Sequence, residues 1–302
     1  MKKQIHNFMK GIIGDYFSDS VLHDPLCNYI DHKMMDYSLL FGRLVITHYE
    51  IFSSEPSPEN VSRAAAAMEL LILSIDIYDD LQDGDNNDAV WMKESPGVAL
   101  NLANALAVVS QDCLAKGSSL SLNSQLLHAV HKYLLSAAVG QYRDIENTIS
   151  TEEDYLEMLR LKSGSLTSMA ASVGYMLTEE RKEEEQIRRL SALVGIIGQI
   201  DNDMLAIQLI DQKSDMKLKK RTLPVFYLLD QRRNDLITRY YSGELRWEDL
   251  VRNKQVVKRE LAASGAVQYT AVVREIYKQK YKALISELPL SKDQIMKLNE
   301  FV

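Results

Sequence analysis

An apolar helical run that ends in a cluster of aspartates constrains this chain more than any other stretch. Residues 70–88 read LLILSIDIYDDLQDGDNND, and the apolar pattern leads directly into Asp79, Asp80 and Asp83 before Gly84 breaks it. Side chains four apart share a helix face, so Asp79 and Asp83 point the same way, and Asp80 lies about 100° round the axis. Converging carboxylates raise each other's pKa unless a cation separates them. The spacing predicts a site for Mg²⁺, which takes one or two carboxylates with water and phosphate oxygens. A solvated acidic helix end is the alternative.

The composition indicates an all-α protein. The 302 residues are 46% hydrophobic and include only 13 Gly and 6 Pro, the residues that interrupt helices. The net charge of −7 argues against nucleic-acid binding, which needs a basic surface. No stretch approaches the ~18 apolar residues of a membrane span, and the two cysteines form neither a metal spacing nor a disulfide framework. We therefore expect a cytoplasmic protein with no transmembrane segment and no nucleic-acid partner.

Helical patterns follow one another along the chain without strand-like alternation. The first fifty residues predict two or three helices, and both Thr151 and Ser291 resemble helix N-caps. Long helices are expected over residues 60–83, 98–114, 121–144 and 190–210. No repeat or domain boundary interrupts the pattern, so we expect one helical domain over residues 1–302.

Polar residues interrupt the later apolar helices at a few positions. Residues 201–203 form a second acidic cluster, Asp-Asn-Asp, inside an apolar helix, where polar groups are costly to bury unless paired. Lys162 and Lys220 fall at the ends of intervening helices. Two acidic clusters facing each other across a helical bundle, with lysines nearby, suit a diphosphate bridged by Mg²⁺. Such groups stabilise a departing pyrophosphate, and an apolar interior would hold a hydrocarbon and exclude water.

The order of these motifs resembles that of the trans-isoprenyl diphosphate synthases, or polyprenyl synthases. Five segments match the family's motifs in the family's order between residues 64 and 224: AAAMELLILSIDIYDDLQD with the first DDxxD motif, GQYRD, KSGSL, GIIGQIDND and DMKLKKRTLP. The resemblance implies the single-domain helical bundle of the isoprenoid synthase fold, Mg²⁺ as the cofactor, and a possible homodimer.

The resemblance also implies which residues hold the metal. Asp79 and Asp83 would ligate Mg²⁺, with Asp80 in a supporting role. The family's second DDxxD motif reads Asn-Asp-Met-Leu-Ala at residues 202–206, so only Asp203 remains in register as a further metal ligand. An offset of one residue turns a helical side chain by about 100°, so Asp201, just outside the register, is a weaker substitute.

A further set of residues is expected to bind the prenyl diphosphate. Two lysines would contact the allylic diphosphate and act with the aspartates in catalysis, and two residues of the GQYRD segment would hold the helix that faces the metal. Side chains about one turn before Asp79 would form the floor of the pocket for the prenyl tail, with core packing as the alternative for Ile75. The two lysines are Lys162 and Lys220, the two residues of the GQYRD segment are Gln141 and Asp144, and the residues of the pocket floor are Ser74, Ile75 and Tyr78.

The chain departs from the family where an acceptor diphosphate would bind. The family's Gly-Gly-Lys-x-x-Arg-Pro motif has no counterpart, because the segment FGRLVITHY offers at most Arg43 and His48. The arginine pair that follows the first DDxxD motif is replaced by Asp-Asn-Asn at residues 85–87. A second diphosphate could hardly be held without those cations. We therefore expect an acceptor other than isopentenyl diphosphate.

A closer resemblance is to the ComQ-type competence-pheromone prenyltransferases. It is carried by ELLILSIDIYDDLQDGDNNDAVWMK, RLKSGSL and GAVQYTAVVREIYKQK. It implies transfer of a geranyl or farnesyl group from its diphosphate to a tryptophan of a ComX-type precursor peptide, which matures a quorum-sensing pheromone. An electron-rich indole can attack an allylic cation without prior deprotonation, and aromatic faces stabilise such a cation. The chain's own Trp91 and Trp247 are expected to pack or to lie at an interface.

Three alternatives stay open: a chain-elongating prenyl diphosphate synthase, a class I terpene cyclase, and a non-catalytic helical partner subunit. The missing acceptor cations argue against the first. Ala206 and Ile210 stand where a cyclase needs Ser and Glu in its metal motif. The incomplete second aspartate motif keeps the third open, and Mg²⁺-dependent release of pyrophosphate would distinguish it from the enzymes.

Overall fold

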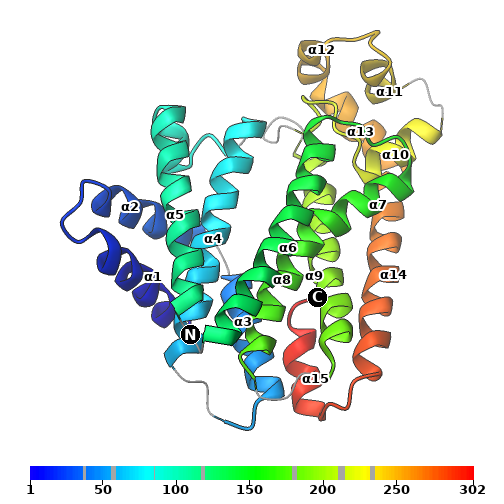
Figure 1. Cartoon of the computed structure of the whole chain (residues 1–302). Helices are drawn as coiled ribbons and strands as arrows, with labels where there is room; N and C mark the ends of the chain where they lie inside the picture. Colours follow the sequence, from blue (N-terminus) through cyan, green and yellow to red (C-terminus); the bar gives the residue numbers. More distant parts are fainter. Residues whose placement is uncertain are drawn as a thin grey trace. The chain divides into compact units, whose positions relative to one another are not determined.

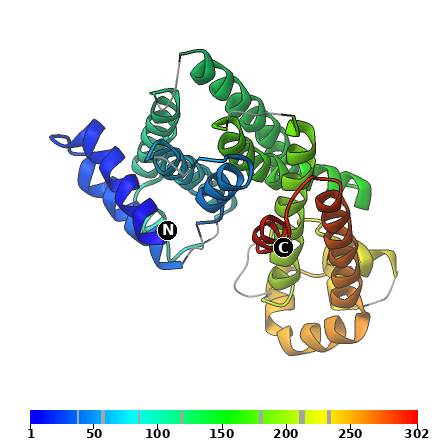
Figure 2. The same ribbon diagram turned by 90° about the horizontal axis from the view of Figure 1, so that it is seen from below.

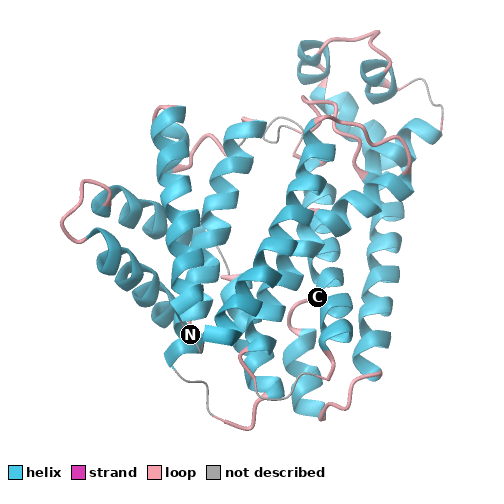
Figure 3. Cartoon of the chain, in the orientation of Figure 1, coloured by secondary structure: helices cyan, strands magenta, loops and turns pink. Residues whose placement is uncertain are grey.

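Helices are the only regular secondary structure in the part of the chain that the structure describes (Figure 3). The structure is a computed structural model, and it describes residues 1–36, 39–55, 59–84, 86–116, 120–178, 182–209, 215–231 and 235–302. The predicted all-α class is therefore confirmed. The described helices are α1 (Lys2–Phe17), α2 (His23–Asp36), α3 (Leu40–Phe52), α4 (Glu59–Asp83), the short 3₁₀ helix η1 (Val90–Lys93), α5 (Pro96–Lys116), α6 (Leu120–Ile145), α7 (Glu152–Leu161), α8 (Ser163–Met176), α9 (Glu184–Ala206), α10 (Leu223–Asp230), α11 (Leu236–Tyr241), α12 (Trp247–Arg252), α13 (Lys254–Ser264), α14 (Ala266–Ser286) and α15 (Lys292–Asn299).

The predicted long helices are present, and their ends differ from the predictions by a few residues. The largest difference is at α9, which begins at Glu184, six residues before the predicted start. Glu184 and Glu185 lie in its first turn, where acidic side chains favour a helix N-terminus. Ile210, the predicted end, lies outside the described residues. The cap at Thr151 is confirmed as a capping box, because its side chain accepts from the Asp154 amide while Asp154 accepts from the Thr151 amide.

The chain divides into two compact units. Unit 1 consists of Met1–Leu135, Leu166–Ser191 and Leu290–Leu298, and unit 2 of Ser136–Ser165, Ala192–Pro289 and Asn299–Val302. Helices α6, α8, α9 and α15 contribute residues to both units. The single-domain organisation stays a prediction.

In unit 1, α4 is the central helix and packs against α1, α3 and α5 (Figures 1 and 2). Its middle turns are buried, and small residues such as Ala65 allow close neighbours: a Cβ at Gly42 of α3 would lie 3.3 Å from the Ala65 carbonyl oxygen. The buried Glu69 carboxylate accepts a hydrogen bond from the Gly42 amide at 2.7 Å and lies 3.6 Å from the Lys33 ammonium. These contacts fix the helix that ends in the first aspartate cluster.

In unit 2, two hydrophobic clusters position the predicted lysines and the second acidic cluster. One joins α7, α9, α10 and α14 and includes Tyr155, Ile200 and Leu223. The other surrounds α10 to α13 and includes Met216 and Tyr240. Met216, four residues before Lys220, belongs to the second cluster, and Leu223, three residues after Lys220, belongs to the first.

Helix α5 meets a length-and-composition test for membrane spanning, the only one to do so among the residues described. The sequence prediction considered only nearly continuous apolar stretches, so it did not identify α5 as a candidate span. The core helix of a soluble protein passes the same test, and the α5 side chains Leu102 and Leu106 are buried where α5 packs against α4. The finding is weak support for a span.

Candidate functional site

The carboxyl end of α4 carries the first aspartate cluster. Asp79, Asp80 and Asp83 are all half-buried, and Asp80 makes two hydrogen bonds to protein side chains. Its Oδ2 atom accepts hydrogen bonds from the Trp91 indole N–H at 2.7 Å and from the Asn86 side-chain amide at 3.0 Å. Burial raises the pKa of Asp80 to about 6, against the opposing effect of these two donors. The middle carboxylate is therefore fixed by protein donors.

The turn after α4 explains why these donors reach Asp80. Gly84 and Asn86 have positive φ angles of 63° and 54°, a left-handed conformation that Gly and Asn tolerate best. This reverses the chain, and Trp91 of η1 becomes buried with its ring edge-on to Tyr29. The predicted packing role of Trp91 is thereby confirmed. Asn86 stands in the segment that replaces the family's arginine pair; Asp85 of the same segment lies outside the described residues.

The three predicted tail-pocket residues lie on the preceding turn of α4. Ser74 is fully buried, and Ile75 and Tyr78 are half-buried. The Tyr78 hydroxyl donates to the Asn104 side-chain oxygen of α5 at 2.5 Å. Their role as the floor of a prenyl pocket stays a prediction.

In unit 2, Asp144 brings together the two predicted lysines. Its Oδ2 atom lies 2.8 Å from the Lys162 ammonium and 3.0 Å from the Lys220 ammonium, and the side chains are 12%, 18% and 9% exposed, respectively. Burial raises the pKa of Asp144, but the two ammonium groups outweigh it and the pKa lies below its usual value. Gln141, three residues earlier on α6, is half-buried. Lys162 and Lys220 lie 18 and 76 positions after Asp144 in the sequence, and the three side chains form one charged cluster.

Close backbone packing at Gly140 places Lys162 beside Asp144. The backbone of Lys162, between α7 and α8, has φ −73° and ψ −84°, which interrupts the helix. A Cβ atom at Gly140 would lie 2.4 Å from the Lys162 nitrogen, so only glycine permits this approach. Asp144 is one helical turn beyond Gly140 on α6, and the contact therefore sets the spacing of the charged cluster.

The second acidic cluster makes bonds to protein partners. The Asp203 carboxylate accepts from the Tyr155 hydroxyl at 2.5 Å and from the Gln199 side-chain amide at 2.9 Å. Burial raises the pKa of Asp203 to about 7, in opposition to the hydrogen bond from Tyr155. Asp201 pairs with Arg274 of α14 at 2.7 Å. Both aspartates of this cluster are therefore engaged within the protein, and the metal-binding role of Asp203 stays a prediction.

The donor chemistry at the end of α4 fits Mg²⁺. Within the described ranges, no three His, Cys, Asp or Glu side chains cluster as a complete metal site. Mg²⁺ does not require one, because it keeps water and substrate phosphate oxygens as ligands. Asp79 and Asp83, one turn apart, offer the one or two carboxylates that such an ion takes.

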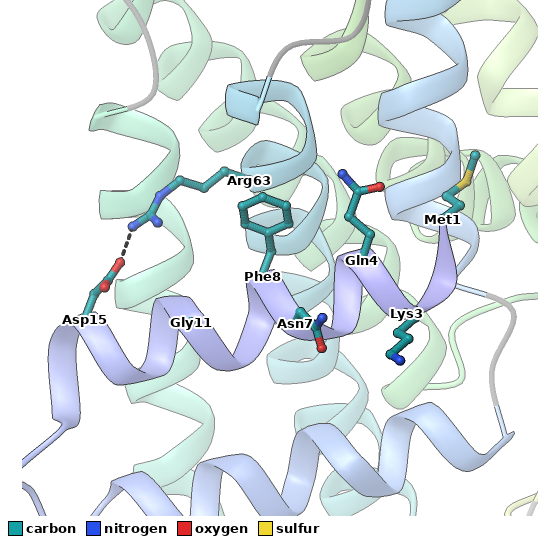
Figure 4. Close-up of a pocket in the computed structure, with 8 residues that line it drawn as sticks. All are labelled: Met1, Lys3, Gln4, Asn7, Phe8, Gly11, Asp15 and Arg63. Atoms are coloured by element: carbon teal, nitrogen blue, oxygen red, sulfur yellow. Dashed lines mark hydrogen bonds and ion pairs between the residues drawn. The ribbon is translucent and has the colours of Figure 1, made fainter.

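A pocket of about 630 Å³ lies elsewhere in unit 1, between α1 and Arg63 of α4 (Figure 4). Its lining includes Phe8 and Gln4, and Arg63 pairs with Asp15 at 2.7 Å. Arg63 precedes Asp79 by sixteen residues of α4, which corresponds to about 24 Å of helix. The pocket contains none of the predicted site residues.

The chain matches known proteins over most of its length. The family model described as polyprenyl synthetase matches residues 37–257. The chain belongs to the polyprenyl synthetase family. Among family relatives, the chain is 35% identical to the tryptophan prenyltransferase ComQ of Bacillus subtilis strain 168, over 95% of this chain and 93% of the relative. It is 32% identical to the ComQ of Bacillus subtilis subsp. natto, over 98% and 90%. The predicted ComQ-type resemblance is confirmed.

Solved structures of polyprenyl synthetases confirm the predicted isoprenoid synthase fold. A geranylgeranyl pyrophosphate synthase has a TM-score of 0.84 at 20% identity, covering 100% of this chain and 97% of that one. The geranylgeranyl pyrophosphate synthase of Corynebacterium glutamicum, complexed with isoprenyl diphosphate and magnesium, has a TM-score of 0.81 at 15% identity, covering 99% and 95%. At these identities the likeness concerns the fold alone.

Several residues of the site were missed by sequence reasoning. Gln199 could have been found, because it lies four residues before Asp203 and shares its helix face. Tyr155, Trp91 and Arg274 carry no such signal, since each reaches its aspartate from a different element.

Proposed function

We propose that this protein transfers a geranyl or farnesyl group from its diphosphate to a tryptophan of a ComX-type precursor peptide, a step in the maturation of a quorum-sensing pheromone. The observation that carries the proposal is the likeness to tryptophan prenyltransferases over nearly the full chain. It agrees with a chain that keeps two largely buried lysines for a donor diphosphate and lacks the family's cationic motifs for an acceptor diphosphate.

The lysine cluster has the properties needed to bind the donor. Lys162 and Lys220 share the Asp144 carboxylate, and the Lys220 ammonium also lies 3.9 Å from the Asp215 carboxylate, so both ammonium groups are fixed before a ligand arrives. Both ammonium groups are largely buried, with side-chain exposures of 18% and 9%. Preorganised charge of this kind stabilises the negative charge that develops on a diphosphate as its bond to the prenyl carbon breaks.

The end of α4 supplies the metal site in this proposal. Asp79 and Asp83 would hold Mg²⁺, and Asp80 would keep the helix end in place through Trp91 and Asn86. When bound, Mg²⁺ supplies positive charge to the diphosphate oxygens and makes diphosphate a better leaving group.

The acceptor chemistry requires little from the protein. The prenyl carbon–oxygen bond breaks to give diphosphate and an allylic cation, an indole carbon of the peptide donates its electron pair to that cation, and a proton is then lost to solvent. Because the indole reacts without prior deprotonation, no strong base is needed. The cytoplasmic location and the homodimer predicted from the sequence stay predictions.

The test is incubation of the protein with Mg²⁺, a tryptophan-containing precursor peptide, and geranyl or farnesyl diphosphate, followed by peptide mass measurement. We expect a mass gain of one prenyl group, lost on chelation of Mg²⁺ and in the Asp79→Ala variant. A peptide with phenylalanine in place of tryptophan is the matched control. Pyrophosphate release without any peptide modification would overturn the proposal.

Chain elongation is a second candidate because a short chain isoprenyl diphosphate synthase of Methanocaldococcus jannaschii is 30% identical over 57% of this chain and 56% of that protein. Adding isopentenyl diphosphate in place of the peptide tests it. Formation of longer prenyl diphosphates would favour this candidate over peptide prenylation.

A further inference from the structure

The segment that carries Lys220 is fixed by side chains from outside it. This lysine segment, residues 215–221, lies just before α10 and has no regular secondary structure of its own beyond turns. Two adjacent tyrosines of α11 donate to its backbone carbonyls: the Tyr240 hydroxyl to Lys217 at 3.0 Å, and the Tyr241 hydroxyl to Lys220 at 2.8 Å. The same residue whose ammonium contacts Asp144 is therefore held at its carbonyl by Tyr241.

A third hydrogen bond and a ring contact hold Lys219, which lies between Lys217 and Lys220 in the sequence. The Asn147 side-chain amide donates to the Lys219 carbonyl at 3.0 Å. The Lys219 ammonium lies 4.7 Å from the centre of the Tyr240 ring, within the range of a cation–π interaction. Lys219 has a φ of 56°, a left-handed conformation that is unfavourable for a lysine by about 1 kcal/mol. An unfavourable backbone conformation persists only where the surroundings impose it.

The tyrosines are themselves immobilised. Tyr240 is 3% exposed and shares a hydrophobic cluster with Met216 of the lysine segment and Leu250 of α12. Its ring lies edge-on to that of Tyr241, with 5.6 Å between ring centres. The packed helix α11 thus places the two tyrosine hydroxyls at the backbone carbonyls of the lysine segment.

We propose that Tyr240 and Tyr241 are positioning residues for donor binding, because their hydroxyls hold the lysine segment so that the Lys220 ammonium is in place for the prenyl diphosphate. This inference rests on the proposed function. Both hydroxyls donate to backbone carbonyls, those of Lys217 and Lys220, so they act on the donor through the backbone of the lysine segment.

The test uses Tyr→Phe variants, which remove the hydroxyl and keep the ring. We expect Tyr240→Phe and Tyr241→Phe each to raise the KM for the prenyl diphosphate by about three- to tenfold, the equivalent of one hydrogen bond, with kcat within about twofold of the wild type. Tyr269→Phe is the matched control, because its hydroxyl donates to Glu152 at 2.6 Å and not to the lysine segment. Its KM should remain at the wild-type value.

Hydrogen exchange supplies a readout that does not depend on activity. The Lys220 amide donates to the Asp215 carbonyl at 2.8 Å and the Lys219 amide to Met216 at 3.1 Å. We expect both amides to exchange faster in Tyr241→Phe than in the wild type, and at the wild-type rate in Tyr269→Phe.

The outcomes separate this inference from the proposed function. A wild-type protein that binds no prenyl diphosphate overturns the proposed function. A wild-type protein that binds it, with tyrosine variants whose KM and amide exchange are unchanged, overturns the positioning role.

Discussion

Replacing Gly140 by alanine should move Lys162 away from Asp144 within the charged cluster. The new Cβ would lie 2.4 Å from the Lys162 nitrogen and 2.8 Å from the Leu161 carbonyl carbon. Both are backbone atoms, so no side-chain rotation can relieve the contact. Ordinary contact begins at 3.4 Å, and α6 must therefore move by about 1 Å from the α7–α8 junction.

The magnitude follows from two opposing effects. Overpacking of this kind costs about 1–3 kcal/mol, and alanine in place of glycine within a helix recovers up to about 1 kcal/mol. We expect a net loss of about 2 kcal/mol in the free energy of unfolding, measured by urea titration. The same displacement moves Lys162 away from Asp144, so kcat/KM for the prenyl diphosphate should fall by up to about a hundredfold.

Gly14→Ala is the matched control for this substitution. Gly14 lies within α1, and a Cβ there would have nothing within 4 Å, so the variant should gain about 0.5–1 kcal/mol of stability. A Gly140→Ala protein as stable as the wild type would refute the close contact inferred between α6 and Lys162. Unchanged donor kinetics in a destabilised variant would refute the link between this contact and binding.

Two further predictions concern buried groups of unit 1. Burial lowers the pKa of His48 from 6.5 to about 4, although its hydrogen bond to the Leu44 carbonyl opposes the shift. The unfolded chain then takes up this proton at a higher pH than the folded one, so stability is full above pH 6.5 and should fall by about 2 kcal/mol by pH 5. Urea titrations at both pH values should show a smaller fall in His48→Gln; an equal fall in both proteins would contradict the assignment. Trp91→Phe removes the indole donor to Asp80 and should cost about 1–3 kcal/mol of stability and raise the Mg²⁺ concentration needed for half-maximal activity. Wild-type values of both would show that Trp91 does not support the end of α4.

Much of the local structure was predictable from neighbouring residues. The long helix ending at Asp83, the cap at Thr151 and the turn at Gly84 were predicted correctly, because helix faces, caps and positive φ angles depend on residues within a few positions. The different setting of Asp80 also follows from its position on the helix, about 100° from Asp79. Its partners could not be predicted, because Trp91 reaches it only after the chain has reversed through Gly84 and Asn86.

The sequence by itself determined an all-α chain with an acidic helix end, two lysines at helix ends, and no cations for a second diphosphate. Only the tertiary structure decided that Lys162 and Lys220 meet at Asp144, that Asp203 is buried against Tyr155 and Gln199, and that two tyrosines hold the lysine segment. The reason is physical. Helical periodicity is a property of each segment alone, whereas a charge pair or a buried hydrogen bond depends on which segments pack together, and that is set by the shapes of entire helix faces.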